Sequence, residues 1–242
     1  SVVGAGLIIR LGVVAGIERA NKILMPLLLT LLVVAVGRSI TLPGAERGLY
    51  FLFKPDLSLL TSYRTWLEAL TQSAWSTGAG WGLILTYAVY MKRDEGAVNS
   101  STALGLGNNT ASLLAGMAIV PTAFAVLAEN EALEAMAAGN VGLTFVWIPQ
   151  LFALMPGGAV FQGVFFFALF CAALSSLIAM VELATRILMD GGMSRRVAVR
   201  YVVAATVFGG APSAVSVTVF ENQDWAWGLA LMVSGLFIAF GV

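Results

Sequence analysis

Charged residues and residues with catalytic or metal-binding side chains are scarce in this chain. Only 11% of its 242 residues are Asp, Glu, Lys or Arg, whereas a soluble domain carries about 25%. There is no histidine, which argues against a histidine metal site or a catalytic triad built on histidine. The single cysteine, Cys171, cannot form a disulfide within the chain. The formal net charge is +0, so no strongly basic composition points to nucleic acid as a partner.

Apolar residues make up 59% of the chain, and the mean hydropathy is +0.91. This composition predicts an all-α, polytopic transmembrane helical bundle, because a helix satisfies its own backbone hydrogen bonds in lipid. We expect five fuller spans, at residues 23–37, 69–91, 96–128, 159 to about 187, and 201–220. A remnant lies at each end, at residues 1–13 and 225–242.

Two of these boundaries rest on helix-breaking residues. The apolar run 135–181 is too long for one helix, and "MPGGAV" at residues 155–160 is expected to divide it. The span 201–220 is expected to be interrupted by "GGAP" at residues 209–212. The chain begins without Met and both its ends lie in apolar runs. We therefore expect a single transmembrane domain, residues 1–242, that is truncated at both ends.

The positions of lysine and arginine predict the orientation in a cell membrane. Nine basic residues flank alternate loops and are expected on the cytoplasmic side: Arg10, Arg19, Lys22, Lys92, Arg93, Arg186, Arg195, Arg196 and Arg200. The other four are Arg38, Arg47, Lys54 and Arg64. This asymmetry places residues 42–63 and 128–158 outside. Both segments are long enough for short surface helices, and "ENEALEAMAAG" at residues 129–139 is helix-like.

The stretch "STGAGWG", residues 76–82, places three glycines in the middle of a charge-free, membrane-length segment. Each glycine costs about 1 kcal/mol relative to alanine inside a helix. An interrupted helix frees backbone amides that suit a carboxylate and carbonyls that suit a small cation. The stretch is therefore either a substrate-binding hinge or a small-residue contact between helices, and both remain open at this point.

Two further polar segments lie in apolar spans. "GNNTAS", residues 107–112, places Asn108 and Ser112 four residues apart on one helical face, and "CAALSSLIAM", residues 171–180, contains Ser175 and Ser176. A serine alone often bonds the carbonyl four residues before it, and an asparagine often joins two helices. Three oxygen-rich segments on three spans instead favour Na⁺, which prefers oxygen ligands.

In three further segments the chain resembles the neurotransmitter:sodium symporter family, in its bacterial amino-acid-transporter branch. "GIERANKILMP" (16–26) is similar to the family's inner loop between helices four and five. "YFLFKPDLSLL" (50–60) is similar to its outer loop before helix six, and "LTYAVYMKRDE" (85–95) to the end of helix six. The resemblance implies part of an inverted-repeat transporter fold, from the end of helix four into helix ten, with a discontinuous helix at residues 78–82.

The resemblance also implies residues for substrate and for two sodium sites, each only partly present here. The substrate would lie against Trp75, Ser76, Gly78, Trp81, Ser176 and Met180. The first Na⁺ would take Ser76 and Asn108 as ligands, and the second Ala172 by its carbonyl with Ser175 and Ser176. Gly78 stands where some small-substrate members carry a side chain, which implies room for a larger substrate.

A chloride site follows from the same resemblance. Chloride-independent members carry an acidic residue at the position of Ser112, so an external anion is expected here, held by Gln72, Ser76 and Ser112. The alternative is that Glu68 compensates the sodium charge.

Acidic residues also match gating positions in the family. Tyr90 and Asp190 match the inner gate, and Asp224 matches the outer one. The alternative is that both aspartates are ordinary helix-end acids at the water interface. Glu182 lies inside a span, and we expect it to pair with Arg186 four residues later, without a role in transport.

The sequence thus predicts a multi-pass protein of the cell membrane, not an enzyme. Its predicted function is sodium-coupled, chloride-assisted symport of an amino acid by alternating access. The expected partners are an amino acid and the lipid bilayer, with no nucleic acid, and the oligomeric state stays open. The alternative is a non-transporting membrane scaffold or a channel-like helical protein.

Overall fold

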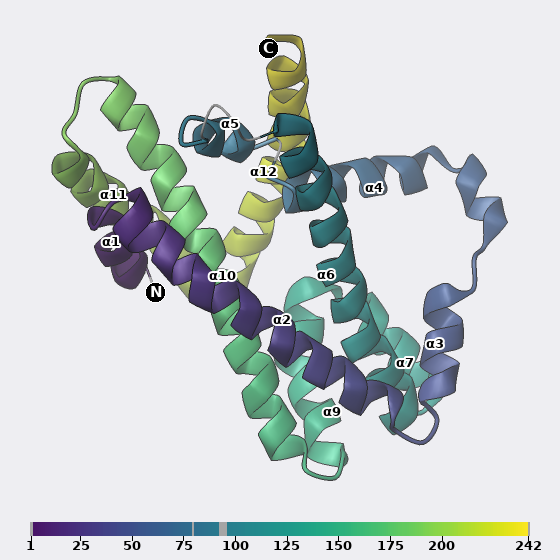
Figure 1. Cartoon of the computed structure of the whole chain (residues 1–242). Helices are drawn as coiled ribbons and strands as arrows, with labels where there is room; N and C mark the ends of the chain where they lie inside the picture. The colour runs from purple at the N-terminus through teal and green to yellow at the C-terminus, as the bar shows by residue number, and fades with distance from the viewer. Residues whose placement is uncertain (1, 79, 92–95, 242) are drawn as a thin grey trace. The chain divides into compact units, whose positions relative to one another are not determined.

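The computed structural model describes residues 2–78, 80–91 and 96–241. All secondary-structure elements among these residues are helices, joined by short connections, and there is no β-strand among them. The side chains of residues 13–15 and 140 are not described. In chain order the elements are α1 (Val2–Arg10), the π-helix η1 (Val13–Glu18), α2 (Arg19–Ile40), α3 (Ala45–Phe53), the 3₁₀-helix η2 (Leu57–Thr61), α4 (Tyr63–Ser76), α5 (Leu83–Ala88), α6 (Ala97–Val126), α7 (Glu129–Ala137), α8 (Gly139–Gly142), the π-helix η3 (Leu143–Trp147), α9 (Ile148–Leu154), α10 (Gly158–Asp190), α11 (Arg195–Val215) and α12 (Val217–Gly241). Figure 1 labels most of them.

Five helices among the described residues are long and apolar enough to cross a membrane: Gly16–Ile40, Ala97–Val126, Gly158–Asp190, Arg195–Val215 and Val217–Gly241. The predicted span 69–91 is not one of them, because it is broken between α4 and α5 as the glycines indicated. The segment expected only as a remnant, 225–242, instead belongs to the 25-residue helix α12. Large apolar side chains stay exposed on these helices, which is typical of surfaces that face lipid.

The division of the long apolar run at "MPGGAV" is confirmed. Met155 is extended, with φ −102° and ψ 147°, and ends α9. Gly157 then adopts φ 75°, a left-handed conformation that suits glycine, and α10 begins at Gly158. The helix-like segment 129–139 is also confirmed, since α7 covers Glu129–Ala137.

The interruption predicted at "GGAP" is wrong. Helix α11 continues through Pro212 to Val215, and the chain becomes extended only at Ser216, with φ −138° and ψ 115°. The amide of Ser216 still donates to the Pro212 carbonyl over 3.1 Å. A proline removes one hydrogen bond of its own and disturbs the preceding turn, so a helix can run on past it for a turn before it ends. Residues 217–220 therefore belong to α12.

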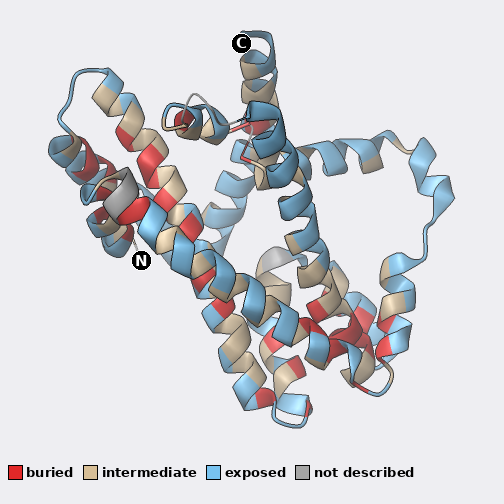
Figure 2. Cartoon of the chain, in the orientation of Figure 1, coloured by how far each residue is buried: buried red, intermediate tan, exposed pale blue. Residues whose placement is uncertain are grey.

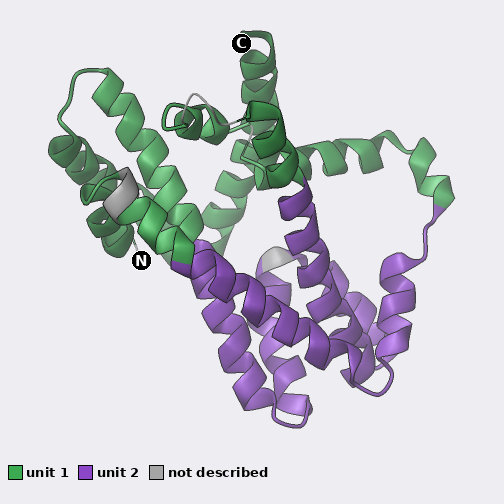
Figure 3. Ribbon diagram, viewed as in Figure 1, with its two compact units in different colours: residues 1–22, 57–105, 174–242 green, residues 23–56, 106–173 purple. Residues whose placement is uncertain are grey.

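The chain forms two compact units, each coloured separately in Figure 3. Unit 1 comprises residues 1–22, 57–105 and 174–242, and in it α11 packs against α1 and α12, and α4 packs against α12. The contact of α1 with α11 is close, because a Cβ added at Gly6 would come 2.6 Å from a methyl group of Val203.

Unit 2 comprises residues 23–56 and 106–173. Its main core joins the end of α6 to α7 and α9, with buried Ala123, Phe124, Leu127, Ala132, Ala135, Ile148 and Leu151. Figure 2 shows buried residues gathered around these helices. Helix α3 packs on the same end of α6, where Phe51 lies 4.9 Å from Phe124 between ring centroids and Arg47 Nη2 donates to the Phe124 carbonyl over 2.6 Å.

Candidate functional site

The helix expected to be discontinuous is broken between Ser76 and Leu83. Helix α4 ends at Ser76, and Thr77 follows as its C-cap. Gly78 and Gly82 have φ values of 73° and 76°, a region that side chains with a Cβ rarely adopt. Gly82 is the residue before α5. The glycines therefore end one half-helix and start the next, and the prediction of a break is confirmed; Ala79 lies outside the described residues.

The backbone of the break turns back on itself. The Gly78 carbonyl accepts hydrogen bonds from the amides of Trp81 and Leu83, over 3.2 and 3.3 Å. The amide of Gly80 donates to the Ala74 carbonyl over 3.5 Å. Three amides of the segment are thus used internally, so the expectation that free amides of the second half-helix bind a carboxylate does not hold for these positions.

The backbone of the break packs closely against α12. A Cβ added at Gly80 would come 2.7 Å from the backbone oxygen of Leu231, closer than real side chains approach. A Cβ added at Gly235 would lie 3.7 Å from the Gly80 Cα. Glycine at position 80 thus allows a backbone approach to α12 that any larger residue would prevent.

Gly78 does not provide room for a larger substrate, which corrects that expectation. Gly78 is buried, and a Cβ added to it would meet Leu83 Cδ1 at 2.8 Å. The space beside this glycine is therefore already filled by the side chain of Leu83. Its role in the structure is conformational, since the break needs a positive φ at this position.

Three tryptophans gather at the break. The rings of Trp75 and Trp81 meet edge to face, with centroids 5.4 Å apart and an interplanar angle of 74°. On its other side Trp81 lies 5.9 Å from Trp227 of α12. The indole nitrogen of Trp81 is buried and has no hydrogen-bond partner. Trp75 and Trp81 are expected at the site from the sequence, whereas Trp227 is not. No local sequence pattern indicates that the break packs closely against α12.

The second polar segment lies on α10, which runs unbroken through it. Ala172, Ser176 and Met180 follow one another at intervals of four residues, so they form one stripe along the helix. Ser176 is exposed, Ser175 is buried at 9% exposure, and Ala172 and Met180 are half-buried. The stripe, together with the adjacent Ser175, carries the predicted contacts of α10 with substrate and with the second Na⁺.

The remaining predicted ion ligands lie on α4 and α6. Gln72 and Ser76 are one turn apart on α4, in unit 1. Asn108 and Ser112 are one turn apart on α6, in unit 2, where Asn108 is half-buried and Ser112 is exposed. Each pair shares a helical face, which was predicted for Asn108 and Ser112. The two pairs belong to different units.

Near the expected cytoplasmic end, Glu182 is fully buried and bonded on both carboxylate oxygens. Arg195 Nη2 donates to Oε2 over 2.6 Å, and Nη1 donates to Oε1 over 3.1 Å. The hydroxyl of Tyr90 also donates to Oε1, over 2.8 Å. Arg195 Nε reaches the Ile9 carbonyl at 3.1 Å. These contacts join α1, α10, α11 and the segment after α5 into one polar cluster.

The expected pair of Glu182 with Arg186 is therefore wrong. Arg186 instead pairs with Asp190 over 2.8 Å, also at a spacing of four residues, and its guanidinium lies 5.9 Å from the Tyr90 ring centroid. Arg195 holds both oxygens of the buried carboxylate with two nitrogens of its guanidinium, whereas Arg186 is engaged by Asp190. Tyr90 and Asp190, predicted as inner-gate residues, thus meet the same arginine, Arg186.

Asp224 is the eighth residue of α12 and is exposed. The helix therefore begins before Asp224, whereas the sequence predicted a start just after it. The start at Val217 follows from the extended Ser216, whose hydroxyl accepts a hydrogen bond from the Val219 amide over 3.4 Å. Ser213 donates to the side-chain oxygen of the neighbouring Gln223.

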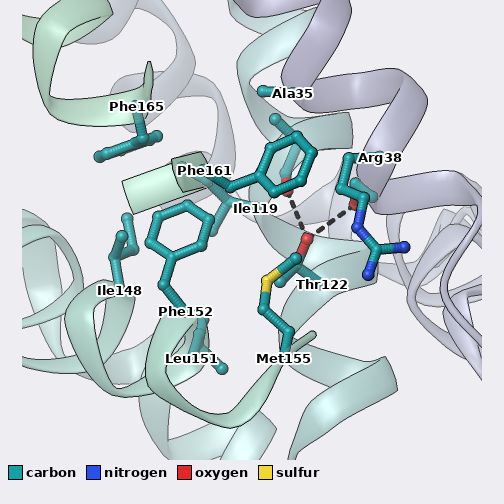
Figure 4. Close-up of a pocket in the computed structure, with 12 residues that line it drawn as sticks. Ala35, Arg38, Ile119, Thr122, Ile148, Leu151, Phe152, Met155, Phe161 and Phe165 are labelled. Carbon is teal, nitrogen blue, oxygen red and sulfur yellow. Dashed lines mark hydrogen bonds between the residues drawn. The ribbon is translucent and has the colours of Figure 1, made fainter. Parts of the chain in front are cut away.

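Unit 2 contains a small cavity that the sequence did not indicate (Figure 4). Its volume is about 20 Å³, which suits one water molecule. Phe152, Phe161 and Phe165 line much of it, and the hydroxyl of Thr122 is bonded to Ser39 Oγ and to the Ala118 carbonyl, at 2.9 and 2.8 Å. None of the predicted site residues lines this cavity.

Comparison with known proteins gives consistent matches. The sodium:neurotransmitter symporter family matches residues 1–223. An uncharacterized sodium-dependent transporter of Methanocaldococcus jannaschii is 34% identical over 201 residues, which are 82% of this chain and 41% of that protein. A sodium- and chloride-dependent GABA transporter of Drosophila melanogaster is 32% identical over 162 residues, 66% of this chain and 17% of that protein.

A solved structure gives the same result. The crystal structure of MhsT in complex with L-phenylalanine matches with a TM-score of 0.84 and 31% identity, covering 98% of this chain and 56% of that one. The chain spans about two fifths of the length of the curated sodium-dependent transporters from Methanocaldococcus jannaschii and Bacillus subtilis. The matched family consists of symporters rather than enzymes, and the five membrane-length helices among the described residues make this a multi-pass membrane protein. The chain belongs to the sodium:neurotransmitter symporter family.

Proposed function

We propose that the protein containing this chain is a sodium-coupled, chloride-assisted symporter of an amino acid that works by alternating access. The observation that carries the proposal is the broken helix between Ser76 and Leu83, with positive φ at Gly78 and Gly82. Irregular backbone within a membrane-length segment is tolerated only where protein or a water-filled cavity covers it. In transporters with broken helices, such segments form the substrate and ion sites near the bilayer midplane.

The substrate is proposed to lie beside this break. Trp75, Ser76, Gly78 and Trp81 belong to it, and the α10 stripe offers Ser176 and Met180. An amino acid is supported by the MhsT structure, which contains L-phenylalanine and covers nearly the whole chain. Since three amides of the break are used internally, we expect bound Na⁺ to be important for holding the carboxylate.

Two sodium ions are proposed to provide the driving force. Ser76 and Asn108 are the proposed ligands of the first, and the Ala172 carbonyl with Ser175 and Ser176 those of the second. These donors are hydroxyl, amide and carbonyl oxygens, which is the ligand chemistry that hard cations prefer. The burial of Ser175 supports a dehydrated site on this part of α10.

Chloride is proposed to bind Gln72, Ser76 and Ser112 and to offset the sodium charge. The alternative compensating residue, Glu68, forms an ion pair with Arg64 over 2.8 Å on an exposed surface, with side-chain exposures of 67% and 78%. Its charge is therefore already balanced locally. This leaves the sodium charge to an external anion, because a buried charge without a nearby counter-charge is costly.

The two ends of the transport path are proposed to close with polar clusters. Tyr90 and Asp190, joined through Arg186, would form the inner gate, and Asp224 part of the outer one. The buried pair of Glu182 and Arg195 extends the inner cluster, since Tyr90 donates to the same carboxylate. Opening toward the cytoplasm would require these contacts to separate.

The experiment is uptake of isotope-labelled amino acids into proteoliposomes that contain the complete gene product. We expect saturable uptake with Na⁺ outside and none when K⁺ replaces it. Ser176→Ala removes a proposed sodium ligand and should abolish uptake, whereas Ser100→Ala, at an exposed serine in the first turn of α6, should leave it intact. Uptake that is indifferent to sodium would refute the proposal.

The alternative, a membrane scaffold or channel-like protein, makes a different prediction. It would bind no amino acid and show no saturable uptake. A scintillation-proximity assay with tritiated amino acids separates the two, because only a transporter gives sodium-dependent, competable binding.

A further inference from the structure

The indole nitrogen of Trp81 is the starting observation. It is buried and has no hydrogen-bond partner, although it lies in the segment between the two half-helices. An indole N–H can only donate, so nothing but an acceptor atom can satisfy it. Buried donors without a partner are rare in native proteins, and each one requires an explanation such as an unseen ligand or water.

The surroundings restrict what the acceptor can be. The ring centroids of Trp75 and Trp227 lie 5.4 and 5.9 Å from that of Trp81, so carbon-rich rings flank the indole that carries the donor. No Lys, Arg, Asp or Glu occurs at residues 69–91 or 225–242, the segments that carry the three rings. A negatively charged side chain placed here would have no counter-charge from these segments, and burying it would be costly.

We infer that the Trp81 N–H donates a hydrogen bond to a neutral oxygen in the side chain of the transported amino acid. The inference rests on the proposed function and narrows its substrate class to neutral amino acids with a side-chain amide or hydroxyl. A compact substrate side chain agrees with the space beside Gly78, because the side chain of Leu83 already fills it. Trp81 is then a specificity-determining residue, because a substrate without an acceptor leaves its N–H unsatisfied.

The test uses substrate pairs of equal shape that differ in the acceptor. L-threonine and L-valine form one pair, and L-asparagine and L-leucine form another. Each is used to compete with sodium-dependent uptake by the complete gene product in proteoliposomes. In the wild type, we expect the member with the oxygen to compete at about tenfold lower concentration than its partner, as the loss of a buried hydrogen bond predicts.

Two variants at position 81 remove the donor. Trp81→Phe keeps an aromatic ring, and incorporation of benzothienylalanine at the same position keeps the size of the indole while sulfur replaces the N–H. Both should abolish the advantage of the oxygen-bearing member of each pair, because its buried oxygen then has no donor at this position. The matched control is Trp225→Phe, which removes an N–H from a ring on the same helix that is 71% exposed and lies outside the cluster at the break, and it should keep the discrimination.

The outcomes are distinguishable from failure of the proposed function. Absence of sodium-dependent uptake in the wild type refutes the symport proposal itself. Sodium-dependent uptake with no preference for threonine over valine or asparagine over leucine overturns the inference, since the donor is then satisfied by water or by another part of the protein. A preference that persists in the benzothienylalanine protein also overturns it. The comparison of substrates in the wild type tests the inference even if neither variant folds.

Discussion

Glu182 illustrates at the scale of one residue how burial selects a partner. Its carboxylate is fully buried, and Arg195 holds both oxygens while Tyr90 donates to one of them. The helical spacing predicted Arg186, because residues four apart share a face. A buried carboxylate needs more than one donor to offset its desolvation, and Arg195 of α11 provides two of them. No local pattern in the sequence encodes that contact across 13 residues.

The first prediction follows from this pair. Glu182→Gln should lower the free energy of unfolding by about 3 kcal/mol, because it leaves the largely buried Arg195 without its counter-charge. Glu68→Gln is the matched control, since it removes the same kind of charge from an exposed pair and should cost less than about 1 kcal/mol. Thermal unfolding of the purified complete gene product in detergent measures both. Equal shifts in the two variants would contradict the role given to burial.

A second residue-scale prediction concerns chloride. Ser112→Glu places a carboxylate one turn from Asn108 on α6, where it can offset the proposed sodium charge from within the protein. Uptake by the wild type should fall when gluconate replaces chloride, and uptake by the variant should no longer respond to that replacement. Uptake assays in paired chloride and gluconate buffers measure this. A wild type that ignores the exchange would remove the chloride site from the proposal.

At the scale of elements, the sequence predicted the break in the helix but not its packing. Three glycines in a charge-free span lower the stability of a helix at that point, and this effect comes from the residues themselves. The interruption predicted at residues 209–212 of α11 was wrong, because Pro212 alone does not say how far the helix continues beyond it. Trp227 at the candidate site was missed because its approach to Trp81 depends on how closely two helices pass.

The packing of the break gives an element-scale prediction. Gly80→Ala should destabilise the protein by about 1–3 kcal/mol, because the new methyl group would meet the Leu231 backbone oxygen at 2.7 Å and must push the break away from α12. Sodium-dependent uptake should fall with it. Gly228→Ala on α12 is the control, since a Cβ there meets nothing within 4 Å. Thermal unfolding and uptake are measured on both, and a tolerated Gly80→Ala would argue against the close approach.

At the scale of the whole molecule, the sequence predicted membrane crossing and a direction for it. Apolar length alone indicated the long helices, and the structure has five of sufficient length among its described residues. Direction rests on the distribution of basic residues, which is a property of the loops rather than of packing. The ligand sets of the proposed ion sites are the part that sequence predicts least directly, since they combine residues from distant helices and were inferred here from resemblance.

Orientation can be tested by labelling single cysteines. Glu131→Cys on α7 and Arg196→Cys on α11 lie at exposed positions on opposite predicted sides. With cysteines outside this chain removed, a membrane-impermeant maleimide should label Glu131→Cys on intact cells and Arg196→Cys only after permeabilisation. The native Cys171 is 2% exposed and should add little background. The reverse pattern would invert the proposed topology.

The tryptophan cluster at the break has a practical consequence. Three of the chain's six tryptophans lie within it, so their indoles absorb and emit as neighbours rather than as isolated chromophores. Indoles held this close couple their electronic transitions, and that coupling depends steeply on their mutual angle and distance. The coupled part of the near-ultraviolet circular dichroism should therefore change when these three rings move relative to one another, without any added label.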